Sequence, residues 1–282
     1  MLQACVDDSG NIYQGKTSVL VGYVASAESW ATFSDRWAAA LAERPAIAYL
    51  KASDAMALSK KGEFKGWTPE ARDAKLSRLI DVINETPILY GAAAIVNNAD
   101  FLRVASKHPD PKISDPFFFL FAQILRGLIV AHRDLGPKEK VEFIFDSTSQ
   151  AGHHLATLFS DLMFTAPTSI QALGIENAPT FRDEKDFLPL QAADLAVNRV
   201  RNFFERYLDD QAAKPGWILD RLGESGVKLA MLYSDAPYLE TTIRGAELVK
   251  MYLDAGPPEA RAARFARLRE WIEGLPEPTK RL

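Results

Sequence analysis

The chain has 282 residues, of which 48% are hydrophobic and 25% are charged, so it is long enough to bury a substantial core. Its net charge of −4 excludes a strongly basic protein that coats nucleic acid, although a local basic groove stays compatible with it. With Cys5 as its one cysteine, the sequence excludes an intrachain disulfide and a thiolate metal cluster, and it suggests a reducing, cytoplasmic compartment. The first residues lack the basic and apolar regions of a secretory signal, which gives the same expectation.

The first part of the chain alternates apolar runs with amphipathic segments. Its predicted elements are strands at 2–7 and 17–25, a helix at 27–43, a short strand at 46–54, a loop at 62–67, a helix from 68 to about 84 and a strand at 88–96. Trp30, Phe33 and Trp37 recur at helical spacing, and Thr68-Pro69-Glu70 is a typical helix start.

The second part continues the alternation. Its predicted elements are a helix at 115–133, a strand at 140–146, a helix at about 149–163, a strand at 169–175, a helix at about 188–208 and a mostly helical region after 215. The stretch 116–132 is very apolar, but Gln123, Arg126 and Gly127 interrupt it. Because it is also short for a bilayer, we expect a buried helix and no membrane contact.

The order of these elements predicts one mixed sheet. If residues 27–86 are an insertion, the order becomes β, β, β, α, β, α, β, α, which favours an α/β fold with helices covering the sheet. We expect a domain over 1–210 and a mostly helical extension over 211–282 that packs on the same domain.

Acidic residues stand at strand ends. In "VDDSGN", Asp7 and Asp8 precede Ser9 and Gly10, which is typical of a hairpin turn but also places a carboxylate at a sheet edge, where a metal can bind. Asp146 ends "VEFIFD", either as a ligand at the carboxyl end of a strand or as the N-cap of the next helix.

A polar stripe runs along the predicted helix over 188–208. Gln191, Asp194, Asn198 and Arg201 fall on one side of it among apolar residues, so the stripe is either an exposed face or a buried site. The preceding "FRDEKD" adds Asp183, Glu184 and Asp186, which read as a solvated loop.

Other chemistries lack their motifs. The sequence has no glycine-rich phosphate loop and no Gly-x-Ser-x-Gly elbow, and the adjacent His153 and His154 lack the spacing of a zinc helix. Carboxylate ligands point instead to Mg²⁺ or Mn²⁺.

Three segments together resemble a known family. "VDDSGN", "FIFDST" and "FRDEKDFLPLQAADLA" are similar to the family catalogued as domain of unknown function 3800, and "GEFKGW" and "RLIDVI" resemble one of its subgroups. The resemblance covers about residues 3–207. It implies a ribonuclease H-like fold, with a mixed five-stranded sheet flanked by helices, a helical insertion after the second strand and a helical C-terminal extension. Such enzymes act on phosphodiesters with acidic residues and two divalent metal ions.

The resemblance also implies roles for individual residues. Asp7, Asp146 and Asp194 match the metal-binding carboxylates in type and order, with Asp7 shared between two Mg²⁺ or Mn²⁺ ions. Because the helix at 115–133 contains no Glu, Asp183 is expected to supply a fourth catalytic carboxylate. The remaining candidates around the site are Asp8 at the family's Glu position, Ser9 in the turn, Lys51 where the subgroup tends to have His, Asp54, and Gln191 and Asn198 as orienting groups.

Three functions stay open at this point. The leading hypothesis is a metal-dependent phosphodiester hydrolase that acts on DNA or RNA. The second is a catalytically degenerate accessory or binding protein with the same fold, and the third is a hydrolase of a small phosphorylated molecule. Arginines near the end of the chain are either a solvated helix face or a basic arm for a phosphate backbone: Arg261, Arg264, Arg267 and Arg269. The oligomeric state is left open.

Overall fold

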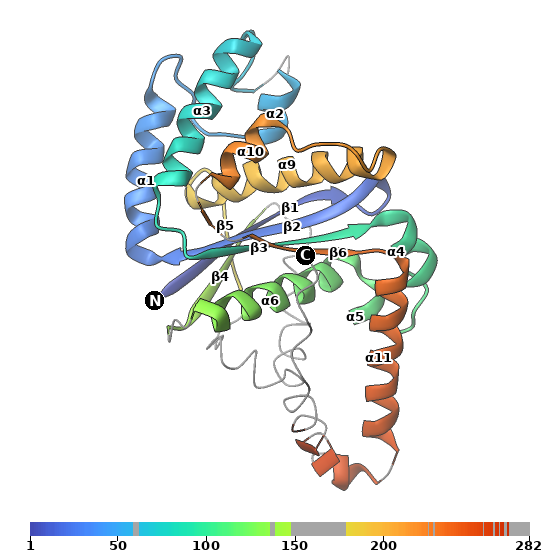
Figure 1. Ribbon diagram of the computed structural model, residues 1–282. Coiled ribbons are helices and arrows are strands. Elements are labelled where there is room, and N and C mark those ends of the chain that lie inside the picture. The colour runs from blue at the N-terminus through green and yellow to red at the C-terminus, as the bar shows by residue number, and fades with distance from the viewer. Residues whose placement is uncertain are drawn as a thin grey trace.

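A mixed sheet of six strands forms the centre of the computed structural model, which describes residues 1–58, 62–135, 139–147, 179–224 and most of 226–270 (Figure 1). The strands are β1 (Leu2–Asn11), β2 (Gln14–Ser26), β3 (Tyr90–Asn97), β4 (Val141–Asp146), β5 (Thr180–Arg182) and β6 (Leu229–Ser234). Their order is β5-β4-β1-β2-β3-β6. The hairpin partners β1, β2 and β3 are antiparallel, whereas β4 runs parallel to β1, β5 to β4 and β6 to β3.

Helices cover both faces of the sheet. The described helices are α1 (Ala27–Ala42), α2 (Ala52–Ala57), α3 (Pro69–Glu85), α4 (Asn98–Val104), α5 (Pro111–Ser114), α6 (Pro116–Leu135), α9 (Pro189–Asp209), α10 (Trp217–Gly223) and α11 (Ala236–Asp254), with a 3₁₀ turn at Pro258–Ala260. The hydroxyls of Ser26 and Thr68 accept backbone hydrogen bonds at the starts of α1 and α3, and the start at Thr68 is the one that the sequence predicts. None of the helices in the described part of the chain is long and apolar enough to cross a membrane.

The alternation of side chains along β1 separates two cores. Cys5 joins the core on one face, where α1, α3 and α9 pack, and Ala4 and Val6 join the core on the other face, beneath α6 (Figure 1). Successive strand residues point to opposite faces, so Asp7 lies on the same face as Cys5. That face is the one that α9 and the insertion cover.

The α/β class and the mixed sheet flanked by helices are confirmed, but the strand count differs from the prediction. The sheet has six strands instead of five because β6, from the segment predicted to be mostly helical, pairs with the free side of β3. The predicted short strand at 46–54 was wrong, since that segment has no strand and enters α2 at Ala52. Ile47, Leu50 and Ala52 of this segment are instead buried in the core that α1, α3 and α9 form with one face of the sheet.

Two predicted elements belong to residues that the structure does not describe. The helix at 149–163 and the strand at 169–175 lie outside the described residues. The division into a domain over 1–210 and an extension over 211–282 stays a prediction, although β6 shows that part of the extension completes the sheet.

Candidate metal centre

The parallel pair β1 and β4 brings two predicted aspartates to one end of the sheet. Val6 of β1 is in register with Phe145 of β4, and the next residue on each strand is an aspartate, Asp7 and Asp146. Both side chains are buried, with Asp7 only 4% exposed. A buried carboxylate at the carboxyl end of a strand requires a compensating partner, which directs attention to the groups around it.

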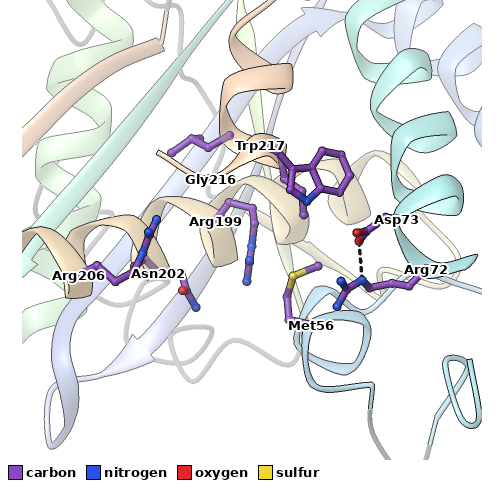
Figure 2. Close-up of a pocket in the computed structure, with 10 residues that line it drawn as sticks. Met56, Arg72, Asp73, Arg199, Asn202, Arg206, Gly216 and Trp217 are labelled. Atoms are coloured by element: carbon purple, nitrogen blue, oxygen red, sulfur yellow. Dashed lines mark hydrogen bonds and ion pairs between the residues drawn. The ribbon is translucent and has the colours of Figure 1, made fainter. Parts of the chain in front are cut away.

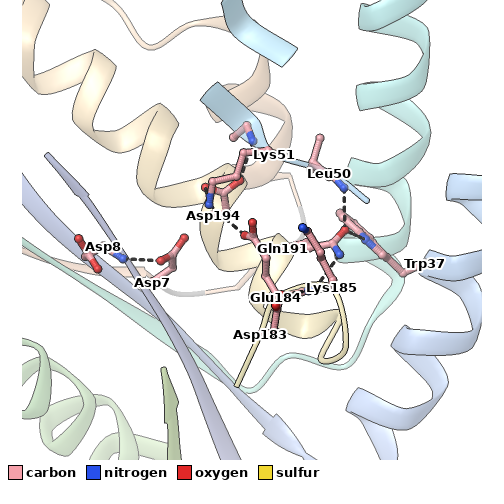
Figure 3. A network of polar contacts seen from close by, with 11 residues as sticks. Asp7, Asp8, Trp37, Leu50, Lys51, Asp183, Glu184, Lys185, Gln191 and Asp194 are labelled. Carbon is pink, nitrogen blue, oxygen red and sulfur yellow. Dashed lines mark hydrogen bonds and ion pairs between the residues drawn. The ribbon is translucent and has the colours of Figure 1, made fainter. Parts of the chain in front are cut away.

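Two further carboxylates enter the same space. Asp194 comes from α9, and Glu184 comes from the turn between β5 and α9 (Figure 3). One carboxylate oxygen from each of Asp7, Glu184 and Asp194 lies within 4.8 Å of the other two, and all three residues are buried. We call these three residues the acidic cluster.

Lys51 of the insertion supplies positive charge to the acidic cluster. Its ammonium lies 3.0 Å from Oε2 of Glu184 and 3.4 Å from Oδ1 of Asp194. The next residue, Ala52, donates its backbone N–H to Oδ2 of Asp194 over 2.6 Å. The start of α2 therefore holds Asp194 by a charge and a hydrogen bond.

The charges in the cluster influence one another. Burial raises the pKa of Asp7 well above its usual range, and the charge of Asp194 raises it further, while Lys51 opposes both. Burial also raises the pKa of Asp194, and it raises that of Glu184 to about 7 against the opposing effect of Lys51. Burial alone would lower the pKa of Lys51, but the carboxylates of Asp194, Asp7 and Glu184 raise it overall. Lys51 consequently stays charged at neutral pH, and the three carboxyl groups outnumber the one cationic group that lies beside them in the described part of the chain.

One oxygen of the cluster has no hydrogen-bond partner in the part of the chain that the structure describes. Oδ1 of Asp7 accepts the backbone N–H of Asp8 over 2.8 Å, whereas Oδ2 is buried with no partner among the described residues. An unsatisfied buried carboxylate oxygen is costly unless a cation or a donor reaches it. An all-oxygen ligand set of this kind fits Mg²⁺ or Mn²⁺, so the residues present fit a divalent ion.

Gln191 joins the insertion to the loop that carries Glu184. Its Oε1 accepts hydrogen bonds from the indole N–H of Trp37 over 2.8 Å and from the backbone N–H of Leu50 over 2.9 Å. Its Nε2 donates to the backbone carbonyl of Glu184 over 2.8 Å. Both the oxygen and the nitrogen of this fully buried amide therefore form hydrogen bonds, and these bonds position the residues on either side of the acidic cluster.

The structure places Glu184, not Asp183, beside Asp7 and Asp194. Asp183 is exposed, and its Oδ1 accepts the backbone N–H of Lys185 in the turn. The expectation that Asp183 supplies a fourth carboxylate is therefore corrected, because Glu184 takes that place. Sequence reasoning missed Glu184 because three acids stand within four residues of "DEKD" and only the path of the turn decides which one points inward.

The remaining predicted residues lie around the site without joining the acidic cluster. Asp8 points to the opposite face of β1 from Asp7, and Ser9 is half-buried further along the strand. Oδ1 of Asn198 accepts a hydrogen bond from Arg199, and no hydrogen bond between Asn198 and the acidic cluster is present among the described residues. Asp54 lies on α2, half-buried, three residues beyond Lys51.

Comparison with known proteins gives a distant structural likeness. No family model matches the sequence, and no curated protein matches it. Among solved structures, the chain is similar to ribonuclease H2 from Pyrococcus horikoshii OT3, with a TM-score of 0.36 and 15% identity over 98% of this chain and 100% of that one. A likeness of this size carries no argument about activity, so the function has to be argued from the site itself.

Proposed function

We propose that the protein is a metal-dependent phosphodiester hydrolase that acts on nucleic acid. The observation that carries this proposal is the acidic cluster, three buried carboxylates of which one, Asp7, has an oxygen without a hydrogen-bond partner among the described residues. Asp146, at the end of the neighbouring strand, supplies a fourth carboxylate to the same end of the sheet. The proposal includes membership of the family of domain of unknown function 3800 and its ribonuclease H-like mechanism.

Each carboxylate has a role in this proposal. Asp7, Asp146 and Asp194 would hold two Mg²⁺ or Mn²⁺ ions with Asp7 shared, and Glu184 would take the role first assigned to Asp183. When bound, such ions supply an activated water and stabilise the leaving oxygen of a phosphodiester. Gln191 keeps Glu184 and the insertion in place. Lys51 adds a positive charge beside Glu184 and Asp194, where it would favour an anionic phosphate.

The experiment is a cleavage assay with a matched pair of variants. Purified protein is incubated with single- and double-stranded DNA, RNA and a DNA–RNA hybrid in Mn²⁺, in Mg²⁺ and in chelator. We expect cleavage that depends on the metal, is lost in Asp7→Asn and persists in Asp8→Asn, whose side chain faces away from the cluster. Inertness of the wild type towards every nucleic acid would contradict the proposal, and hydrolysis of a small phosphodiester alone would favour an enzyme of small phosphorylated molecules.

The contacts of Lys51 favour a second candidate, a degenerate accessory protein. Its ammonium already pairs with both Glu184 and Asp194, two of the three carboxylates that a metal ion would need. Calorimetry with Mn²⁺ separates the two candidates. Tight binding by the wild type supports the hydrolase, whereas binding by Lys51→Met but not by the wild type supports the degenerate protein.

A further inference from the structure

A pocket of about 370 Å³ lies on another side of α9 from the acidic cluster. Its polar lining comes from α3, α9 and the start of α10 and is rich in arginine, as Figure 2 shows: Arg72, Asp73, Arg199, Asn202, Arg206 and Trp217. Arg199, Asn202 and Arg206 share one face of α9 because they are spaced by three and four residues. We call this feature the arginine pocket.

The arginines are poorly compensated. Arg72 pairs with the carboxylate of its neighbour Asp73 at 2.7 Å. Arg199 donates to the amide oxygen of the adjacent Asn198, and Arg206 donates to the backbone carbonyl of Lys214 over 3.1 Å. Neither Arg199 nor Arg206 forms an ion pair with a carboxylate of the described residues. The pocket therefore carries a net positive charge in a protein whose overall charge is negative.

The electrostatics of Arg199 agree with this geometry. Burial, followed by the positive charges of Arg72 and Arg206, lowers the pKa of Arg199 to about 10, and the charge of Asp194 opposes the shift. Arg199 is still charged at neutral pH, but its charge is unfavourable where it lies. An anion between these guanidinium groups would relieve the repulsion.

Two helices connect the arginine pocket to the acidic cluster. Ala52 at the start of α2 bonds to Asp194, and Met56 on the same helix lines the pocket. At a rise of about 1.5 Å per residue, these two positions are separated by roughly 6 Å along the helix. Along α9, Arg199 follows Asp194 by five residues, or about 8 Å. The two sites are therefore built on the same pair of helices, α2 and α9, within a few residues of each other on each helix.

We infer that the arginine pocket binds a phosphate group and the adjoining base of single-stranded nucleic acid. Guanidinium groups match the two-oxygen edge of a phosphate, which favours this anion. Trp217, 40% exposed at the pocket, offers an indole face on which a base can stack without sequence preference. Asp73 disfavours a ligand with more than one anion deep in the pocket. The inference rests on the proposed function, for which it names single strands as the substrate class.

The test is a binding assay in chelator, where no metal-dependent cleavage occurs. A labelled single-stranded oligonucleotide is titrated with wild type, Arg199→Gln, Arg206→Gln and Trp217→Leu, and with Arg103→Gln as a control of equal charge change on α4. We expect each arginine variant to weaken binding by about tenfold and to reduce the salt slope by about 0.7. Trp217→Leu should weaken binding by about fivefold or more, and Arg103→Gln should match the wild type.

Competition identifies the ligand chemistry. We expect a mononucleotide to displace the oligonucleotide more effectively than inorganic phosphate does, because only the nucleotide offers a base to Trp217. No binding by the wild type, or equal loss in Arg103→Gln and the pocket variants, would overturn the inference. Thermal melts confirm that each variant is folded.

The assay distinguishes this inference from the proposed function. Binding that depends on the pocket without any cleavage in Mn²⁺ would sustain the inference and contradict the hydrolase. Cleavage that is unaffected by all three pocket variants would sustain the hydrolase and overturn the inference.

Discussion

The acidic cluster and the arginine pocket are two charged regions on one helix, and they are compensated differently. Asp194 receives the charge of Lys51 and a hydrogen bond from Ala52, and Glu184 also pairs with Lys51. In the arginine pocket, Asp73 is the carboxylate among the described lining residues, and it pairs with Arg72 alone.

The contrast shows what each region still needs. The acidic cluster contains three carboxyl groups and, among the described residues, only one lysine beside them, so a small divalent cation suits it. The arginine pocket has room for a group of nucleotide size and needs an anion. A helix with one negative and one positive region suits a ligand that carries phosphates across both, with metal ions mediating contact at the acidic end.

The largest expected effect is a loss of cleavage without a loss of oligonucleotide binding. Asp194→Asn removes a ligand charge from the acidic cluster and keeps an oxygen for Ala52, so we expect metal-dependent cleavage to fall by about a hundredfold or more. Oligonucleotide binding in chelator should stay near the wild-type value, because the arginine pocket is untouched. The matched control is Asp186→Asn in the exposed turn. Equal cleavage by Asp194→Asn and the wild type would contradict the assignment of cleavage to the acidic cluster.

The second prediction concerns the support beneath the acidic cluster. Gln191→Leu leaves the indole N–H of Trp37, the N–H of Leu50 and the carbonyl of Glu184 without their partner. We expect the free energy of unfolding to fall by about 3 kcal/mol or more, measured by urea denaturation. Gln123→Leu is the control, since this buried glutamine accepts one described side-chain hydrogen bond, from Tyr238. Equal losses in both variants would show that Gln191 does not support the cluster in this way.

The third prediction uses pH to examine the acidic cluster without metal. The pKa of Glu184 is about 7 in the fold, above the ordinary glutamate value, so the folded state binds the proton more tightly than the unfolded state. The contribution of Glu184 to stability in chelator should therefore be fully present below the ordinary glutamate pKa and be lost as pH rises through 7, by on the order of 2 kcal/mol. Glu184→Gln should flatten this part of the profile. An unchanged slope in the variant would contradict the assignment of the proton to Glu184.

The smallest expected effect lies in the arginine pocket. Arg199→Gln removes a guanidinium that lacks a described carboxylate partner, so we expect the free energy of unfolding to change by less than about 0.5 kcal/mol. Arg221→Gln is the control, because Arg221 is 33% exposed and pairs with Asp81 and Glu224. In Arg221→Gln the free energy of unfolding should fall by about 1 kcal/mol, with both variants measured by thermal melts. A larger loss in Arg199→Gln would assign Arg199 a structural role instead of a binding role.

Local patterns were sufficient for the class of fold and for part of the site. The apolar runs at 2–7, 17–25 and 88–96 predicted strands, and the structure places β1, β2 and β3 over them. The spacing of Trp30, Phe33 and Trp37 predicted the buried face of α1. Such elements are readable because a strand or helix that covers a core repeats its apolar residues with a period of its own. The buried stripe of α9 was one of two open interpretations, and the burial of Gln191 and Asp194 decides between them.

Other features depended on contacts between residues far apart in the chain. Glu184 and Asp183 have the same local chemistry, and only the turn before α9 determines that Glu184 points inward. Lys51 reaches Asp194 across more than a hundred residues of sequence, and β6 joins the sheet only because β3 has a free edge. The arginine pocket is lined by residues of α3 and α9, and the hydrophobic periodicity of each helix does not predict that the two helices lie together. Sequence patterns record the face that each element buries, whereas the pairing of distant elements depends on how those faces pack together, and that was decided by the tertiary structure.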